Sequence, residues 1–189
     1  MKAAGIKPIK HIPDYVRKII DEYYGEGNEH NRITVGHKHK WDGGCICNNG
    51  YTSSIEEFYA DTDCMRSVIC DIAQSEGAEE IKIFAAGSSF FDDKSDTMSF
   101  EIVKDILPLL KAHGTDHRDC RGIMLDVHNG AVGLFIAGAF NYLVRCALVI
   151  NEEIVILPTH NFEFEIYCKT KRESITEFVR RCDFLDIYE

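Results

Sequence analysis

The densest group of potential metal ligands in this chain lies between residues 37 and 47. It consists of His37, His39, Cys45 and Cys47, and a Gly-Gly pair at 43–44 separates the histidines from the cysteines. Imidazole nitrogens and thiolates are the donors that suit tetrahedral zinc. On an extended chain both rings of His-x-His lie on the same side, and the glycines allow the backbone to fold back and present the two sulfurs. The pattern gives the hypothesis of a structural zinc clamp. Its spacing matches no specific zinc signature, and the alternative is a solvated basic loop followed by a glycine turn.

A second group of polar residues, His-Gly-Thr-Asp-His-Arg-Asp-Cys, occupies 113–120. If this loop meets the first one, three ligands and an open position for water would give the catalytic form of zinc. The simpler interpretation places His113 at a helix C-terminus, where the helix dipole stabilises positive charge, and His117 in an exposed turn. His160 lies in a further loop after Pro158. These three histidines are therefore candidate ligand-binding residues.

A third candidate is a cysteine nucleophile. Cys64 follows Asp61-Thr62-Asp63, whose side chains can cap a helix that starts here, and a helix N-terminus lowers the pKa of a thiol. The two acids beside Cys64 would raise that pKa. The segment 64–87, a helix followed by a glycine and a strand, resembles the nucleophile helix of transglutaminase-like and papain-like folds, although it contains no motif of those families. The resemblance implies Cys64 as nucleophile and His128 as base, with Asp126 two residues away to orient the imidazole. The alternative is an ordinary helical cysteine and a hydrogen bond at a strand end.

Composition limits the class of protein. With 189 residues, 45% of them hydrophobic, the chain can bury one core, so we expect a single domain over 1–189. The net charge of -10 argues against nucleic acid as a partner and is compatible with solubility or with a basic partner protein. Scattered cysteines, no basic leader and no apolar run long enough for a membrane span together predict a cytoplasmic protein with reduced thiols. Signatures for ATP, dinucleotides and serine hydrolases are absent.

The hydrophobic pattern predicts an α+β fold with an antiparallel β-meander in the C-terminal half, packed with about four helices. Helices are expected over 12–24, 53–76, 98–112 and 174–184, with a break near 61–63 and a bend at Pro108. Strands are expected over 33–35 and 81–86, and the meander within 122–170. Asn129-Gly130 is the two-residue sequence favoured in tight hairpins, so the apolar run 130–139 is expected to be strand.

Together these features favour an acidic binding protein for a protein partner or a small ligand, using the loops at 37–50 and 113–120, with zinc as a structural clamp. The apolar sheet could also support a homo-oligomer through an edge or a face. The competing hypothesis is a small hydrolase. It would be either zinc-assisted through His37 and His39 or cysteine-based through Cys64 and His128.

Overall fold

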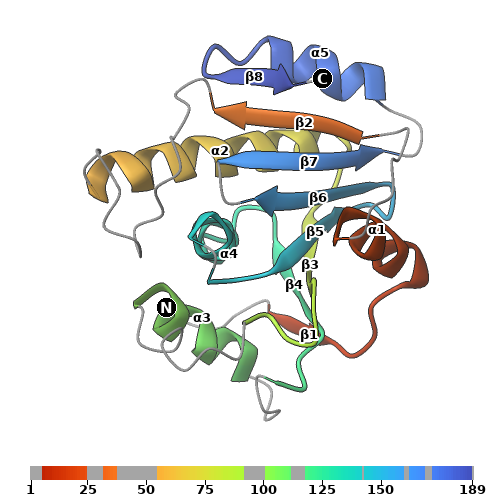
Figure 1. The fold of residues 1–189 in the computed structure, drawn as a ribbon, viewed down its shortest axis with the longest axis vertical. Coiled ribbons are helices and arrows are strands. Elements are labelled where there is room, and N and C mark those ends of the chain that lie inside the picture. Colours follow the sequence, from red (N-terminus) through yellow and green to blue (C-terminus); the bar gives the residue numbers. More distant parts are fainter. Residues whose placement is uncertain are drawn as a thin grey trace.

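The computed structural model describes residues 6–24, 32–37, 55–91, 101–111, 118–141, 143–159, 162–168 and 172–188 (Figure 1). These residues form five helices and eight strands. The helices are α1 (Asp14–Tyr24), α2 (Ile55–Ser75), α3 (Glu101–Lys111), α4 (Ala131–Phe140) and α5 (Arg172–Arg180). The strands are β1 (Lys7–Ile9), β2 (Arg32–His37), β3 (Glu80–Ala85), β4 (Gly122–Asp126), β5 (Cys146–Ile150), β6 (Ile154–Thr159), β7 (Glu163–Cys168) and β8 (Leu185–Tyr188).

All eight strands belong to one antiparallel sheet in the order β1-β4-β3-β5-β6-β7-β2-β8. The consecutive strands β5, β6 and β7 are neighbours, which confirms the antiparallel meander in the C-terminal half. The early strand β2 lies between β7 and β8, so residues from both ends of the chain complete this edge of the sheet. The α+β class is therefore confirmed.

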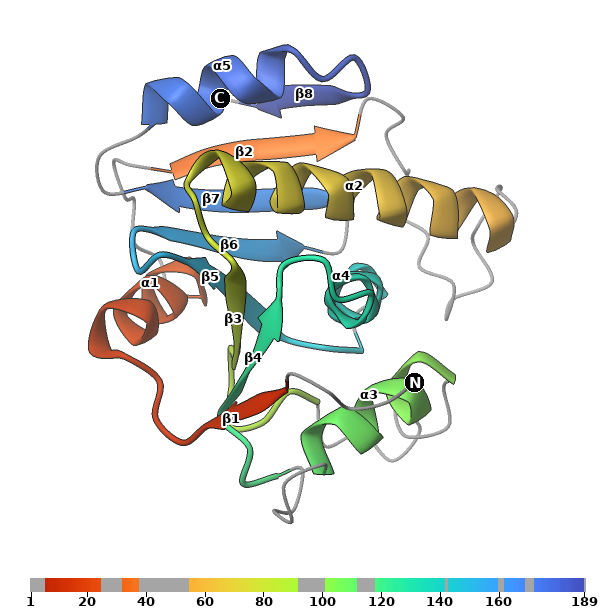
Figure 2. The same ribbon diagram turned by 180° about the vertical axis from the view of Figure 1, so that it is seen from behind.

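The two faces of the sheet carry different numbers of helices (Figures 1 and 2). Helix α1 lies on one face, where Val16 and Ile20 pack in a cluster with Phe84 and Val149. Helices α2, α3, α4 and α5 contribute to the larger core on the other face. Side chains alternate between the faces along each strand because the period of an extended chain is two residues. Such a sheet, covered on both faces, explains why β5 is buried at every position.

Helix α4 replaces the strand expected over 130–139, and that prediction was wrong. The segment is apolar throughout and eight of its ten residues are buried, so it lacks the polar stripe that marks an amphipathic helix. A short apolar run bounded by a turn signal does not distinguish a buried helix from a buried strand. Asn129 does not form a hairpin turn: its side-chain oxygen Oδ1 accepts a hydrogen bond from the amide of Ala131 at 3.0 Å, at the start of the helix. Asn-Gly thus begins a helix here.

Other boundaries also differ from expectation. Helix α2 is continuous from Ile55 to Ser75, so the break expected near 61–63 is absent. Strands β1 and β8 were not expected, and β2 extends from Arg32 to His37 instead of covering 33–35. The strands that were missed are short or mostly polar, which weakens their hydrophobic pattern. Within the described residues, no helix is long and apolar enough to cross a membrane.

A buried carboxyl group on the α1 face gives the fold a dependence on pH. Glu165 in β7 is 8% exposed, accepts hydrogen bonds from the Thr34 hydroxyl at 3.0 and 3.2 Å, and lies 3.4 Å from Nε of Arg32. Burial raises the pKa of Glu165 above 4.5, a trend that Thr34 and Arg32 oppose and Glu163 reinforces. A raised carboxyl pKa means that the folded state holds this proton more tightly than the unfolded state. The contribution of Glu165 to stability is therefore fully present below pH 4.5. It is lost as the pH rises through the pKa that Glu165 has in the folded state.

We expect Glu165→Gln to remove this contribution, because the amide stays neutral at every pH. The Tm of the natural chain should therefore fall relative to the Tm of the variant as the pH rises from about 4 to about 8. Thermal unfolding followed by circular dichroism across that range measures the difference. A difference in Tm that does not change with pH would contradict the assignment.

Candidate functional site

One face of α2 carries polar and aromatic residues where a buried helix would normally carry apolar ones. Tyr59, Thr62, Asp63 and Arg66 stand at positions i, i+3, i+4 and i+7, which lie on the same side of an α-helix. Tyr59 is 46% exposed, and its ring lies edge-on to buried Phe58 with centroids 5.4 Å apart. This face is directed toward α4.

The facing side of α4 carries three small residues and one leucine at the same spacing. Gly130, directly before α4, and Gly133, Leu134 and Ala137 within it occupy positions i, i+3, i+4 and i+7. A Cβ atom built on Gly133 would lie 3.0 Å from Cδ of Arg66, so the glycine allows the stem of that arginine to cross close to α4. A Cβ atom on Gly130 would meet nothing within 4 Å. The small residues therefore leave space between the two helices.

The two faces enclose a groove of about 280 Å³, which we call the α2–α4 groove. It is lined by Tyr59, Thr62, Asp63, Arg66, His128, Gly130, Gly133, Leu134 and Ala137. One wall thus offers a hydroxyl, a carboxylate and a guanidinium, and the other is apolar. A concave site with a few polar groups on an apolar surface is the usual form of a small-ligand site.

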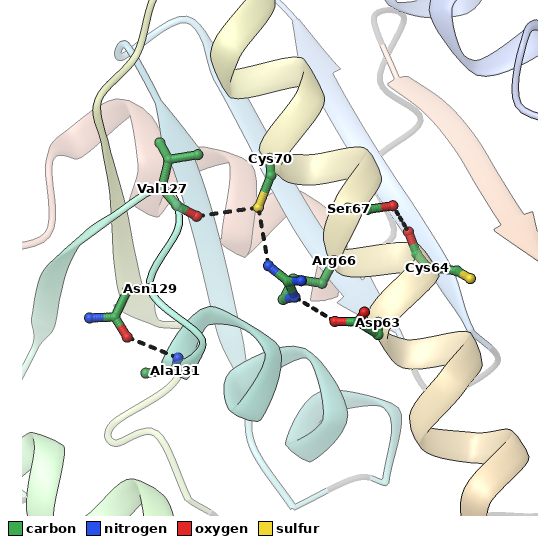
Figure 3. Close-up of polar contacts among 8 residues, drawn as sticks. All are labelled: Asp63, Cys64, Arg66, Ser67, Cys70, Val127, Asn129 and Ala131. Atoms are coloured by element: carbon green, nitrogen blue, oxygen red, sulfur yellow. Dashed lines mark hydrogen bonds and ion pairs between the residues drawn. The ribbon is translucent and has the colours of Figure 1, made fainter. Parts of the chain in front are cut away.

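Arg66 is held in place by two contacts on its own helix (Figure 3). Its Nε donates to Oδ1 of Asp63 at 2.8 Å, and its Nη1 lies 3.8 Å from Sγ of Cys70. The Cys70 thiol in turn donates to the carbonyl oxygen of Val127 at 3.2 Å. Burial raises the pKa of Cys70, although Arg66 opposes this shift, so the sulfur keeps the proton that it donates. The side chains of α2 are thereby tied to the loop that precedes α4.

That loop is fixed by its own side chains. Oδ1 of Asp126 accepts from the amide of His128 at 2.8 Å, and Nε2 of His128 lies 3.1 Å from the amide nitrogen of Gln74. This contact joins the side chain of Gln74 on α2 to the imidazole ring. With the Asn129 contact described above, these bonds set the position of the first turn of α4 beside α2 (Figure 3).

Thr62 has a buried hydroxyl with no hydrogen-bond partner among the described residues. The residue is 4% exposed, lines the α2–α4 groove, and its Oγ1 is fully buried. A buried polar group without a partner costs about 1–3 kcal/mol, and proteins rarely keep one unless something else satisfies it. The free protein is therefore less stable at this position than it need be.

We expect Thr62→Val to stabilise the free protein by about 1 kcal/mol, because valine has the same shape and no hydroxyl. The two residues have similar helix propensity, so the backbone contributes little to the change. Urea-induced unfolding measures the effect, and Thr62→Ser, which keeps the hydroxyl, is the matched control. A loss of stability in the valine variant would show that the hydroxyl has a partner.

Comparisons of the chain with protein-family models, with curated proteins and with solved structures found no match.

The prediction that Cys64 begins a helix was wrong. Cys64 stands nine residues after Ile55, the first residue of α2, so the field of the helix N-terminus does not reach its sulfur. Burial raises the pKa of the thiol, and Asp61 and Asp63 raise it further. In Figure 3 its side chain points away from Arg66, Cys70 and the loop before α4. The physical basis for an activated nucleophile is therefore missing.

His128 and Asp126 do not form the expected pair around the imidazole. Asp126 holds the backbone amide of His128, and the ring contacts Gln74. Gln74, the residue that the His128 ring contacts, lies ten residues beyond Cys64 on α2. This separation corresponds to about 15 Å along the helix axis. His128 instead lines the α2–α4 groove, a site that the sequence pattern did not predict.

We expect a mild alkylating reagent near neutral pH to label Cys64 slowly. Only the thiolate reacts rapidly, and the raised pKa keeps its fraction small. Mass spectrometry of the digested protein at successive times would give the rate for each thiol, with Cys182, which is also partly buried and also has a raised pKa, as the internal reference. Labelling of Cys64 at a rate well above that of Cys182 would restore the nucleophile hypothesis.

Most of the metal and histidine candidates lie outside the described residues. These are His39, Cys45, Cys47, His113, His117 and His160. His37 is the last residue of β2, and only its backbone is described. Within the described part of the chain, no group of three or more His, Cys, Asp or Glu side chains could hold a metal ion.

Proposed function

We propose that this chain is a binding protein for a small ligand, which it holds in the α2–α4 groove. The observation that carries the proposal is the groove of about 280 Å³ itself, in which the Arg66 guanidinium on α2 lies opposite small and apolar residues of α4. A ligand in the groove can pair an acceptor group with this guanidinium and pack its apolar part against Leu134 and Ala137.

Two further features support binding in the groove. Among the described residues, Tyr59 is the large hydrophobic residue that is exposed, and it lines the groove. Its ring packs edge-on against Phe58. An exposed aromatic ring beside polar groups is common where a ligand or partner is recognised. The polar groups are also pre-positioned, because Asp63 and Cys70 restrain Arg66. Restraint before binding lowers the entropy cost of binding.

The experiment that tests the proposal is a panel of small fragments of different charge, screened by the shifts of backbone amide resonances in the labelled full chain. We expect the largest shifts at residues that line the α2–α4 groove. Shifts scattered over the surface, or grouped at another site, would contradict the proposal. The panel must contain neutral, anionic and cationic members so that the result does not depend on one ligand chemistry.

The zinc clamp at His37, His39, Cys45 and Cys47 is a separate proposal, supported by the donor types alone. Elemental analysis of protein purified without chelator tests it, and one zinc per chain that disappears in a Cys45→Ser, Cys47→Ser variant would support it. The hydrolase alternative through Cys64 and His128 has lost the helix N-terminus on which it depended. We therefore place ligand binding first.

A further inference from the structure

We infer that the ligand of the α2–α4 groove is a small monocarboxylate with a flat apolar body, bound through Arg66. This inference rests on the proposed function and names the chemical class of its ligand. It depends on the hydrogen-bonding capacity that Arg66 has left, on the charge around it, and on the shape of the groove.

Arg66 does not use all of its hydrogen-bond donors within the described residues. A guanidinium carries five N–H groups, and two of them, one on Nε and one on Nη1, are directed at Asp63 and Cys70. Nη2 has no partner among the described residues, and the side chain is 26% exposed at the groove. The free donors of Nη2 and Nη1 can face the two oxygens of one carboxylate, the geometry for which arginine is best suited.

The charges around Arg66 favour a ligand that carries a single negative charge. Asp63 already pairs with Arg66 at 2.8 Å, and among the described residues that line the groove Arg66 is the one permanent cation. A dianion such as a phosphate monoester would meet the Asp63 carboxylate and the net charge of -10 with only one guanidinium to offset them. A monocarboxylate needs no more than that guanidinium. The first turn of α4, whose dipole favours an anion, lines the same groove through Gly130 and Gly133.

The apolar surface and the size of the groove describe the rest of the ligand. Tyr59 brings an aromatic ring to the α2 side of the groove, and Leu134 and Ala137 lie on the α4 side. The volume of about 280 Å³ lies just under the roughly 300 Å³ at which sites for drug-sized ligands begin. A ring or a short planar chain fits such a space and can stack on Tyr59.

The test is a titration of the full chain with benzoate and with benzamide, which share a shape and differ in charge, followed by amide shifts at constant ionic strength. We expect benzoate to shift the resonances of the groove residues and to bind at least about tenfold more tightly than benzamide. Arg66→Gln should weaken benzoate binding about ten- to hundredfold, since a hydrogen bond to a charged group is lost. Arg181→Gln is the matched control. Arg181, the residue directly after α5, also pairs with an acid close by in the sequence, Glu177, and should leave benzoate binding unchanged.

A second variant guards against disturbed packing in Arg66→Gln. Arg66→Lys keeps the charge and the pairing with Asp63 but loses the planar fork, and we expect about a tenfold loss of benzoate affinity. Equal affinity for benzoate and benzamide, or unchanged benzoate affinity in both Arg66 variants, would overturn the inference. If neutral or cationic fragments of the panel shift the groove while benzoate does not, the inference fails and the proposed function stands. If no member of the panel shifts the groove, both fail.

Discussion

Phe162→Ala should lower the free energy of unfolding by about 3–5 kcal/mol, the largest effect on stability that we expect from a single change in this chain. Phe162 directly precedes β7 in the connection from β6, and its side chain is fully buried. Its ring stacks on Phe140 of α4 with centroids 4.5 Å apart and meets Phe58 of α2 edge-on at 5.2 Å. Removing the ring leaves a cavity where the sheet and the two groove helices meet, so the loss also reaches the positions of α2 and α4.

The backbone of Phe162 makes this contact unusual. Its φ angle is +57°, in the left-handed region that bulky residues rarely occupy. The aromatic packing must therefore offset a conformational cost of roughly 1–2 kcal/mol. Urea-induced unfolding followed by circular dichroism measures the loss, with Phe162→Leu, which keeps most of the volume, as the control. A cost below about 1 kcal/mol in the alanine variant would show that this ring cluster does not hold the helices on the sheet.

Gly138→Ala should destabilise the protein by about 1–3 kcal/mol, although glycine to alanine normally stabilises a helix. Gly138 is buried in α4, and a Cβ atom there would lie 2.5 Å from Cγ2 of Val144 and 3.5 Å from Cγ2 of Ile102. The carbonyl of Gly138 also accepts hydrogen bonds from the amides of Leu143 and Val144, at 2.9 and 3.1 Å. The chain after α4 is thus held against this glycine and has little freedom to move away.

A double-mutant cycle tests the steric cause. Val144→Ala removes the atom that a new Cβ would strike, so Gly138→Ala should cost less in the Val144→Ala background than in the natural chain. The free energies of unfolding of the four proteins give the coupling. Additive costs would mean that the destabilisation does not come from the contact with Val144.

Much of the fold could be predicted from the sequence because most elements have a clear hydrophobic pattern. Helix α1 carries an apolar stripe, and Pro13 immediately before it suits a helix start. Strand β7 alternates polar and apolar residues. Helix α4 could not be predicted in this way, since its residues are apolar on every side and its first turn has the Asn-Gly sequence of a hairpin. Its identity depends on the tertiary packing that surrounds it.

The candidate site was missed for the same reason. The polar stripe of Tyr59, Thr62, Asp63 and Arg66 was visible as helical spacing, but the expected break near 61–63 divided it. The matching stripe of small residues on α4 has meaning only if 131–140 is a helix. Of the predicted residues, His128 alone lines the groove, and it does so from the loop rather than from a strand. Local chemistry directed attention to cysteines and histidines, whereas the groove arises from two helices that pack side by side.

The most direct test of the proposed site is the affinity of the best groove-binding fragment for Gly130→Leu compared with Gly130→Ala. Gly130 lines the groove, a Cβ atom there meets nothing within 4 Å, and its φ of -56° suits any residue. Leucine should therefore fill the space without disturbing the fold. We expect its unfolding free energy to match that of the alanine variant while fragment affinity falls at least about tenfold. Unchanged affinity in a folded Gly130→Leu protein would contradict a ligand site between α2 and α4.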